Sequence, residues 1–225
     1  MKAYYYLFSI IMLTLSCNSK SQDLTESGKG VSKINEKMMT VKIFNIPEYE
    51  KKLKANPDYT GYKTKENVLV EQNYMLDDQH FGGDYNPKYV IEYLHSEKFP
   101  DGFTDSYIFN KDGILKEYER YFDDIETGIW KKYNREGEIA DQENKDINYP
   151  FLISDVILFS KKNNGDLSQT GSLKRSYDNE KKIYIYIIEW VIKDVEKPYT
   201  QGFILNGRDG QIVESYRKDP PRIKM

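Results

Sequence analysis

Apolar and polar residues alternate in short stretches along most of the chain after residue 38. The first stretch, MMTVKIFN at residues 38–45, predicts a strand. Five further stretches share this alternation and are separated by turns rich in Gly, Asp, Asn or Pro: residues 68–76, 88–95, 106–110, 115–122 and 128–134. Short strands punctuated by such turns predict an antiparallel sheet.

The segment 46–56 has a helical pattern instead. Pro47 suits the first turn of a helix, and Pro57 ends it. Glu50 and Lys54 are four residues apart, which is the spacing of an ion pair on a helix surface. Few apolar residues line one side, so we expect a short surface helix.

A second helix is predicted over residues 153–164, ISDVILFSKKNN. Ser154 is a residue type that caps helix N-termini. Ile153 and Leu158 are spaced to form a hydrophobic staple around that cap.

The stretch KKIYIYIIEWVIKD at residues 181–194 is apolar on both of its alternating faces. It therefore predicts a central strand, covered on one side by the second helix. Strands are also predicted over 172–177 and 202–217, where the sequence NGRDG supplies a hairpin turn. The expected fold is α+β and β-rich: an antiparallel meander sheet with short helices, followed by a small helix-plus-antiparallel-sheet domain.

Composition supports a β-rich chain. The sequence of 225 residues contains 20 Tyr, 10 Phe and 2 Trp, and aromatic side chains favour strands. The net charge is −3, and Lys and Arg are spread along the chain with no basic block. This distribution argues against a nucleic-acid partner, which requires clustered positive charge. The single cysteine excludes an intramolecular disulfide, and no zinc-binding motif is present.

The N-terminus has the composition of a secretory leader. Lys2 provides a positive charge, and residues 3–15 are almost wholly apolar or aromatic. That run is shorter than the ~20 apolar residues that a membrane-spanning helix needs, and it fits a signal-peptide core. The chain becomes polar directly after Cys17, as expected for the start of a mature protein that follows a signal peptide. An ordinary signal peptide containing an incidental cysteine and a buried core helix are the alternatives.

The sequence Leu13-Thr14-Leu15-Ser16-Cys17 resembles the lipobox of bacterial lipoproteins. Thr14 stands where this family usually has Leu. The resemblance implies that Cys17 is lipidated and becomes the first residue of a membrane-anchored protein. Asn18, in place of the Asp that retains such proteins at the inner membrane, favours the outer membrane. We expect a location in the cell envelope.

Residues 107–145 resemble a variant of the MORN repeat. The second repeat carries the match, as Gly128-Ile129-Trp130-Lys131-Lys132-Tyr133 followed by Gly137. The resemblance implies an antiparallel sheet, and some members of this group are antitoxin components. A generic antiparallel meander explains the same spacing of glycines and aromatic residues.

Residues 151–217 resemble the PepSY-type domain. The match consists of Glu189-Trp190-Val191 and the hairpin from Ile204 to Val213, in which Asn206 replaces the usual Asp. This resemblance implies a helix packed on a small antiparallel sheet and a role in peptidase inhibition or envelope binding. The expected organisation is a signal peptide at 1–16, a polar tether at 17–37, a β-rich domain at 38–148, the PepSY-like domain at 149–217 and a tail at 218–225.

One loop has the side chains that catalysis or metal binding requires. The sequence LDDQHFGGDY places Asp77, Asp78, His80 and Asp84 close together, and carboxylates with an imidazole can bind a divalent metal or act as an acid–base pair. A polar hairpin loop explains the same residues. No nucleophile motif or phosphate-binding loop is present.

The sequence favours a non-catalytic envelope lipoprotein without a cofactor, which binds a protein, peptide or glycan partner. Tyrosine and tryptophan on sheet faces would form the binding surface, and the candidates are Trp130, Tyr133, Tyr184, Tyr186 and Trp190. For Trp130 and Trp190, a place in the core or on a sheet face without a ligand is the commoner alternative. An immunity or antitoxin-like protein is the first alternative. A metal-assisted hydrolase that uses the loop with Asp77 and Asp84 is the second.

Overall fold

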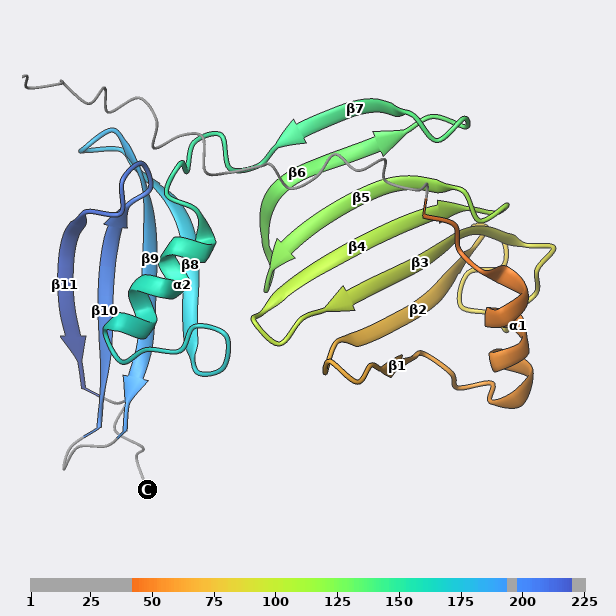
Figure 1. Ribbon diagram of the computed structural model, residues 1–225, viewed down its shortest axis with the longest axis horizontal. Coiled ribbons are helices and arrows are strands. Elements are labelled where there is room, and N and C mark those ends of the chain that lie inside the picture. Colours follow the sequence, from red (N-terminus) through yellow and green to blue (C-terminus); the bar gives the residue numbers. More distant parts are fainter. Residues whose placement is uncertain (1–41, 194–197, 220–225) are drawn as a thin grey trace, which may run out of the picture. The chain divides into compact units, whose positions relative to one another are not determined.

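The computed structural model describes residues 42–193 and 198–219, and its strands form two antiparallel sheets (Figure 1). The first sheet has seven strands in sequence order, so each strand pairs with its neighbours along the chain. Its strands are β1 (Gly61–Lys63), β2 (Leu69–Leu76), β3 (Val90–Lys98), β4 (Phe103–Asn110), β5 (Leu115–Phe122), β6 (Ile125–Tyr133) and β7 (Ile139–Asn144). The β-rich α+β fold is thereby confirmed.

Most strands of this sheet follow the alternation of the sequence. The short edge strand β1 and the fully exposed edge strand β7 were not predicted. The strand expected at residues 38–45 lies partly outside the described residues. Within them, Ile43 makes an isolated bridge with Ile114.

The helix α1 (Ile46–Ala55) forms where the sequence predicts it. The Asn45 side chain accepts a hydrogen bond from the backbone N–H of Glu48, and this bond caps the helix. Tyr49 and Leu53 are buried against the sheet. They belong to a core whose other buried members are Phe44, Leu76, Val90, Tyr93, Tyr107, Phe109 and Leu115.

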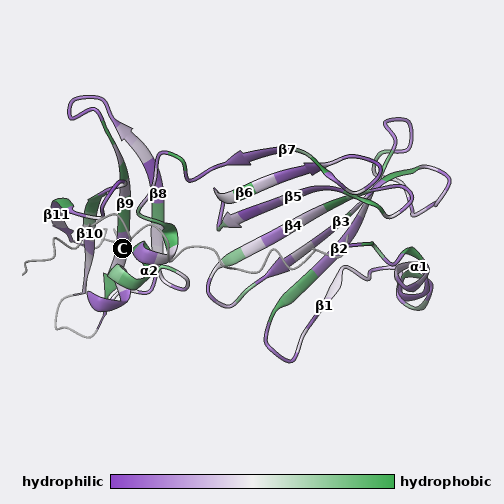
Figure 2. Cartoon of the chain, turned by 45° about the horizontal axis from the view of Figure 1, so that its top comes forward, coloured by the Kyte–Doolittle hydropathy of each residue, from purple (hydrophilic) through white to green (hydrophobic). Residues whose placement is uncertain are grey.

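The second sheet has four strands in the order β11-β10-β9-β8. Its strands are β8 (Gly171–Asp178), β9 (Ile183–Ile192), β10 (Tyr199–Asn206) and β11 (Ile212–Lys218). The central position predicted for residues 181–194 is confirmed, because β9 pairs with both β8 and β10. Figure 2 shows hydrophobic residues concentrated in β9 and β10, whereas β7 is hydrophilic.

The helix α2 (Ile153–Lys162) covers one face of this sheet, but it begins differently from the prediction. The chain is extended at Leu152, which takes the N-cap position. The carboxylate of Asp155 accepts the backbone N–H of Leu152 at 3.2 Å. Ser154 therefore lies inside the first turn. The predicted staple is also wrong, since Ile153 is buried and Leu158 is 56% exposed.

The core beneath α2 also receives a side chain from the first sheet. Phe122, at the end of β5, is fully buried together with Val156, Ile188 and Trp190. Phe103 and Ile125 pack against the same cluster. All described residues belong to one compact unit of the chain. The two sheets are therefore joined by a common apolar core as well as by the chain.

Candidate functional site

The seven-stranded sheet has a covered face and an open face. Along β4, Asp105, Tyr107 and Phe109 are buried on the side where α1 packs. Thr104 and Ser106 alternate with them and are only partly buried. We call the first side the covered face and the second the open face.

Cross-strand register places further residues on the open face. Ser106 lies opposite Ser96 on β3 and opposite Glu119 on β5, and Thr104 lies opposite Tyr121. Successive residues of a strand point to opposite sides of a sheet, so these partners share one face. The open face therefore extends across the central strands of the sheet.

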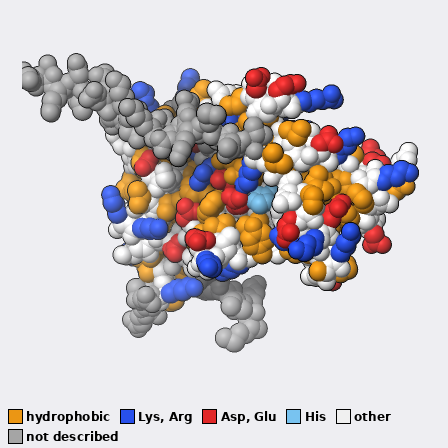
Figure 3. All heavy atoms as spheres, turned by 45° about the vertical axis from the view of Figure 1, so that its right-hand side comes forward, with side chains coloured by type: hydrophobic (Ala, Val, Ile, Leu, Met, Phe, Trp, Pro, Cys, Tyr) orange, Lys and Arg blue, Asp and Glu red, His pale blue; other side chains and the backbone are white. Residues whose placement is uncertain are grey.

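Ion pairs and small polar side chains populate the open face. The ammonium of Lys98 lies 2.9 Å from the Glu71 carboxylate, and Lys116 pairs with Glu92. Exposed pairs of this kind contribute at most about 1 kcal/mol to stability. A partner for the open face would be recognised by mixed polar and aromatic contacts. The side of the molecule drawn in Figure 3, on which a histidine is visible, also mixes acidic and basic side chains with hydrophobic ones.

Trp130 is the largest aromatic residue on β5 to β7, and its position is fixed. The indole N–H donates to the backbone carbonyl of Arg120 at 3.2 Å. The Tyr121 ring lies 5.2 Å from the indole ring, and the ammonium of Lys145 lies 4.2 Å from the indole centroid. These contacts hold the half-buried indole against the open-face residue Tyr121.

Charged groups surround Trp130. Lys145 lies 2.8 Å from the Glu143 carboxylate and 3.0 Å from that of Glu126. The hydrogen bond with Glu143, together with Glu126, raises the pKa of the Lys145 ammonium above its usual range. A depression of about 200 Å³ lies here, lined by Glu117, Tyr118, Glu119, Trp130, Lys131, Lys132, Asp141, Gln142, Glu143 and Lys145.

The covered face contains a band of polar side chains between its two apolar cores. His95 Nε2 lies 3.0 Å from Glu97 Oε1, and Lys42 Nζ lies 2.6 Å from the same oxygen. The hydrogen bond with His95 and the contacts with Lys42 lower the pKa of Glu97 to about 2. The Lys42 ammonium also lies 3.4 Å from the centroid of the Tyr107 ring.

Asp105 continues this band opposite Glu97. Burial raises its pKa, against the opposing effects of the Arg120 guanidinium at 3.4 Å and the Tyr118 hydroxyl at 3.1 Å. Two carboxyl groups with opposite pKa shifts are a pattern that acid–base chemistry uses. Here each carboxylate is bound by side chains of the same band. Such internal pairing is also expected of a purely structural polar cluster, because buried polar groups are hydrogen-bonded.

The predicted acid–base loop brings only two of its candidates together. His80 Nδ1 lies 2.6 Å from Asp77 Oδ1, and this hydrogen bond lowers the pKa of Asp77. The imidazole stacks on the Tyr89 ring. Asp78 is exposed, and Asp84 faces a pocket beside α1. The described residues hold no group of three or more His, Cys, Asp or Glu side chains that could bind a metal ion.

Two predicted surface aromatics are core residues instead. Tyr186 and Trp190 are 0% and 1% exposed beneath α2, so their assignment to a binding surface is wrong. Alternation places both on the helix-facing side of β9, which the sequence could not distinguish from an exposed side. Tyr133 and Trp130 are half-buried. Tyr184 is 38% exposed, and its ring contacts those of Tyr149 and Tyr177.

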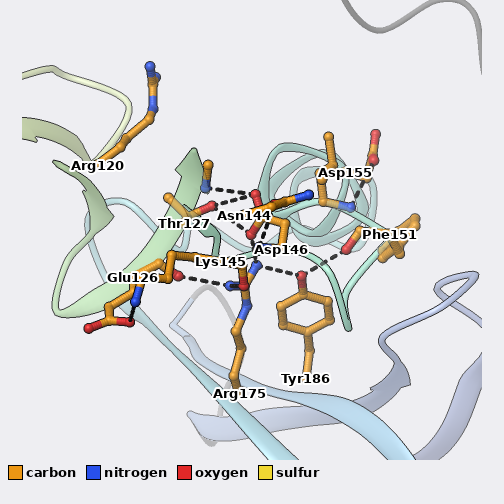
Figure 4. Close-up of polar contacts among 12 residues, drawn as sticks. Arg120, Glu126, Thr127, Asn144, Lys145, Asp146, Phe151, Asp155, Arg175 and Tyr186 are labelled. Atoms are coloured by element: carbon orange, nitrogen blue, oxygen red, sulfur yellow. Dashed lines mark hydrogen bonds and ion pairs between the residues drawn. The ribbon is translucent and has the colours of Figure 1, made fainter. Parts of the chain in front are cut away.

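Sequence reasoning missed an ion pair where the two sheets meet. Arg175 on β8 pairs with Asp146, and both side chains are nearly buried (Figure 4). Asp146 also accepts the Thr127 hydroxyl and the backbone N–H of Gly128. Arg175 donates to the carbonyl of Glu126 at 2.8 Å. These groups come from distant parts of the chain, so no local motif marks them.

Comparison with known proteins identifies no relative. No family model, no curated protein and no solved structure matches the chain. Cys17 lies outside the described residues. Within those residues, no helix has the length and apolar character needed to cross a membrane.

Proposed function

We propose that this protein is a non-catalytic lipoprotein of the cell envelope, anchored through Cys17. It binds a protein, peptide or glycan partner on the open face of its seven-stranded sheet. The observation that carries the proposal is the asymmetry of β4: Asp105, Tyr107 and Phe109 are buried, whereas Thr104 and Ser106 remain accessible. An accessible sheet face of mixed polarity is suited to partner binding rather than to core formation.

Trp130 and Tyr121 serve as the aromatic anchors of this surface. Tryptophan and tyrosine dominate the binding energy of many interfaces because they bury a large area with few rotatable bonds. The hydrogen bond from the indole to the Arg120 carbonyl orients Trp130 before a partner arrives. Glu126, Glu143 and Lys145 supply polar contacts beside it.

Site-specific photo-crosslinking in living cells tests the binding surface. A photoreactive residue at Ser106 reports on the centre of the open face, and one at Lys161, exposed on α2, serves as the control. We expect a discrete crosslinked species from position 106 and none from position 161. Equal crosslinking at both positions would contradict a partner on the open face.

Trp130→Ala, introduced together with the crosslinker at Ser106, tests the anchor. We expect loss of the crosslinked species, while Tyr62→Ala, which removes an exposed aromatic side chain from β1, leaves it intact. Circular dichroism establishes that both variants are folded. Undiminished crosslinking in a folded Trp130→Ala protein would show that Trp130 does not contribute to partner binding.

Metabolic labelling with a palmitate analogue tests the membrane anchor. We expect label on the wild-type protein and none on Cys17→Ala. Label on both proteins, or on neither, would contradict lipid attachment at Cys17. This measurement is independent of the crosslinking, so the two parts of the proposal can fail separately.

A further inference from the structure

A pocket of about 450 Å³ lies between α1 and the residues that follow β2. This volume is within the range of small-molecule sites in proteins. The pocket is distinct from the open face, because Leu53, Tyr74 and Tyr85 in its lining belong to the core on the covered face. Its lining residues are Glu50, Leu53, Lys54, Pro57, Tyr74, Asp84, Tyr85 and Pro87.

Tyrosine rings form part of its wall. The rings of Tyr74 and Tyr85 meet edge to face, with 4.9 Å between their centroids. The centroids of the Tyr85 and Tyr49 rings are 6.1 Å apart, and the Tyr85 hydroxyl lies 3.2 Å from that of Tyr93. Because Tyr49 and Tyr93 are buried, Tyr85 packs on core side chains, and Tyr74 packs in turn on Tyr85. The wall is therefore preorganised.

Two carboxylates face the same pocket. Glu50 accepts a hydrogen bond from the Tyr85 hydroxyl at 2.9 Å, and Asp84 precedes Tyr85 in the chain. Burial raises the pKa of Tyr85, so its hydroxyl keeps the proton that it donates to Glu50. The ion pair expected between Glu50 and Lys54 does not form: neither residue, nor Asp84, takes part in a salt bridge within the described ranges.

The geometry points to a binding site for an organic cation, an ammonium or guanidinium group on a short alkyl chain. Aromatic faces attract such cations through the ring quadrupole. Glu50 and Asp84 supply negative charge, while Leu53, Pro57 and Pro87 contact the alkyl part. The site would be selective, since a neutral ligand of equal shape gains nothing from the carboxylates. The inference does not depend on a partner at the open face.

Lys54 predicts the direction in which a charge change alters the affinity of the pocket. It is exposed at the rim of the pocket, and its positive charge opposes a bound cation. A site for an apolar or anionic ligand would instead tolerate or require Lys54. Removal of this one charge therefore separates the cation from the other ligand classes.

Choline and its neutral isostere 3,3-dimethylbutan-1-ol, titrated into the full folded chain and followed by NMR, test the site. We expect choline to bind at least about tenfold more tightly than the alcohol. The ring resonances of Tyr74 and Tyr85 should shift on binding. Equal affinity for the two ligands, binding without those shifts, or no binding of choline would overturn the inference.

Charge variants provide the second measurement. Glu50→Gln and Asp84→Asn should each weaken choline binding by about fivefold, the effect of one charge ~4 Å away in water. Lys54→Gln should tighten it. Asp101→Asn removes one exposed carboxylate outside the pocket and should have no effect. Weaker choline binding in Lys54→Gln would contradict the cation assignment even if every variant folds normally.

Discussion

At the scale of single residues, the most buried ion pair within the described residues lies where the two sheets meet. The side chains of Asp146 and Arg175 are 12% and 10% exposed, and both make further hydrogen bonds to the first sheet. Arg175 also donates to the Tyr186 hydroxyl, which in turn donates to the carbonyl of Phe151 (Figure 4). A single charge removed from such a network leaves its partner buried and unpaired.

Asp146→Ala should therefore lower the free energy of unfolding by about 3–5 kcal/mol. Urea denaturation followed by circular dichroism measures this change. The matched control is Glu71→Ala, which breaks the exposed pair with Lys98 and should cost less than about 1 kcal/mol. Similar costs for the two variants would mean that the junction contributes no more than a surface ion pair.

Glu97 predicts a dependence of stability on pH. Its pKa in the folded protein is about 2, below the ordinary value near ~4.3, because His95 and Lys42 bind the ionised carboxylate. Its stabilising contribution is complete above the unfolded pKa and is lost as the pH falls towards 2. The difference in unfolding free energy between wild type and Glu97→Gln should therefore shrink from pH 6 to pH 2. A constant difference would show that the carboxylate charge is not involved.

At the scale of elements, α2 and β9 depend on close packing. Trp190 stacks on Phe203, with ring centroids 5.4 Å apart, and Gly165 lies directly against the indole. A Cβ atom on Gly165 would lie 2.4 Å from Trp190 Cδ2. The indole cannot move away without disturbing the core beneath the helix.

Gly165→Ala should destabilise the protein by about 1–3 kcal/mol, which is typical of overpacking. Thermal unfolding measures the loss. Gly82→Ala is the control: its Cβ would meet no atom within 4 Å, so only the strain of its positive φ opposes the change. If Gly165→Ala cost no more than this control, the packing against Trp190 would be looser than the distances indicate.

The hydrophobic periodicity predicted where most helices and strands lie, but it predicted poorly which of their side chains are buried or form caps. The strand β5 and the helix α1 lie where alternation, proline and capping residues place them. Both faces of β9 read as apolar in the sequence, so Trp190 could not be assigned to the buried side. Ser154 matches a cap by residue type, yet the chain is extended at Leu152, which occupies the N-cap position and donates its backbone N–H to the Asp155 carboxylate.

The candidate sites depended even more on tertiary structure. Trp130 was singled out by its place in a glycine-aromatic pattern, but its neighbour Lys145 lies on the far side of a hairpin. The pocket beside α1 combines Glu50 with Asp84 and Tyr85, which are separated by β2. No spacing rule links such residues before the helix is docked.

At the scale of the whole molecule, Phe122 couples the two sheets. It belongs to β5 but is fully buried in the core beneath α2. Phe122→Ala should cost about 3–5 kcal/mol through the cavity it leaves. Hydrogen exchange should lose protection in both sheets, at β4 and at β9. Loss confined to β4 would mean that the second sheet is stable without this contact.

Both sheets are simple meanders, and this topology bears on how the chain reaches its native state. Every strand pairs only with strands adjacent to it in sequence. The contact order of each sheet is therefore low, which is associated with rapid folding. During synthesis, which begins at the N-terminus, each new strand can pair with the strand that precedes it, because no strand requires a partner that is distant in sequence. The docking of Phe122 would then be a late step, made once α2 and β9 exist.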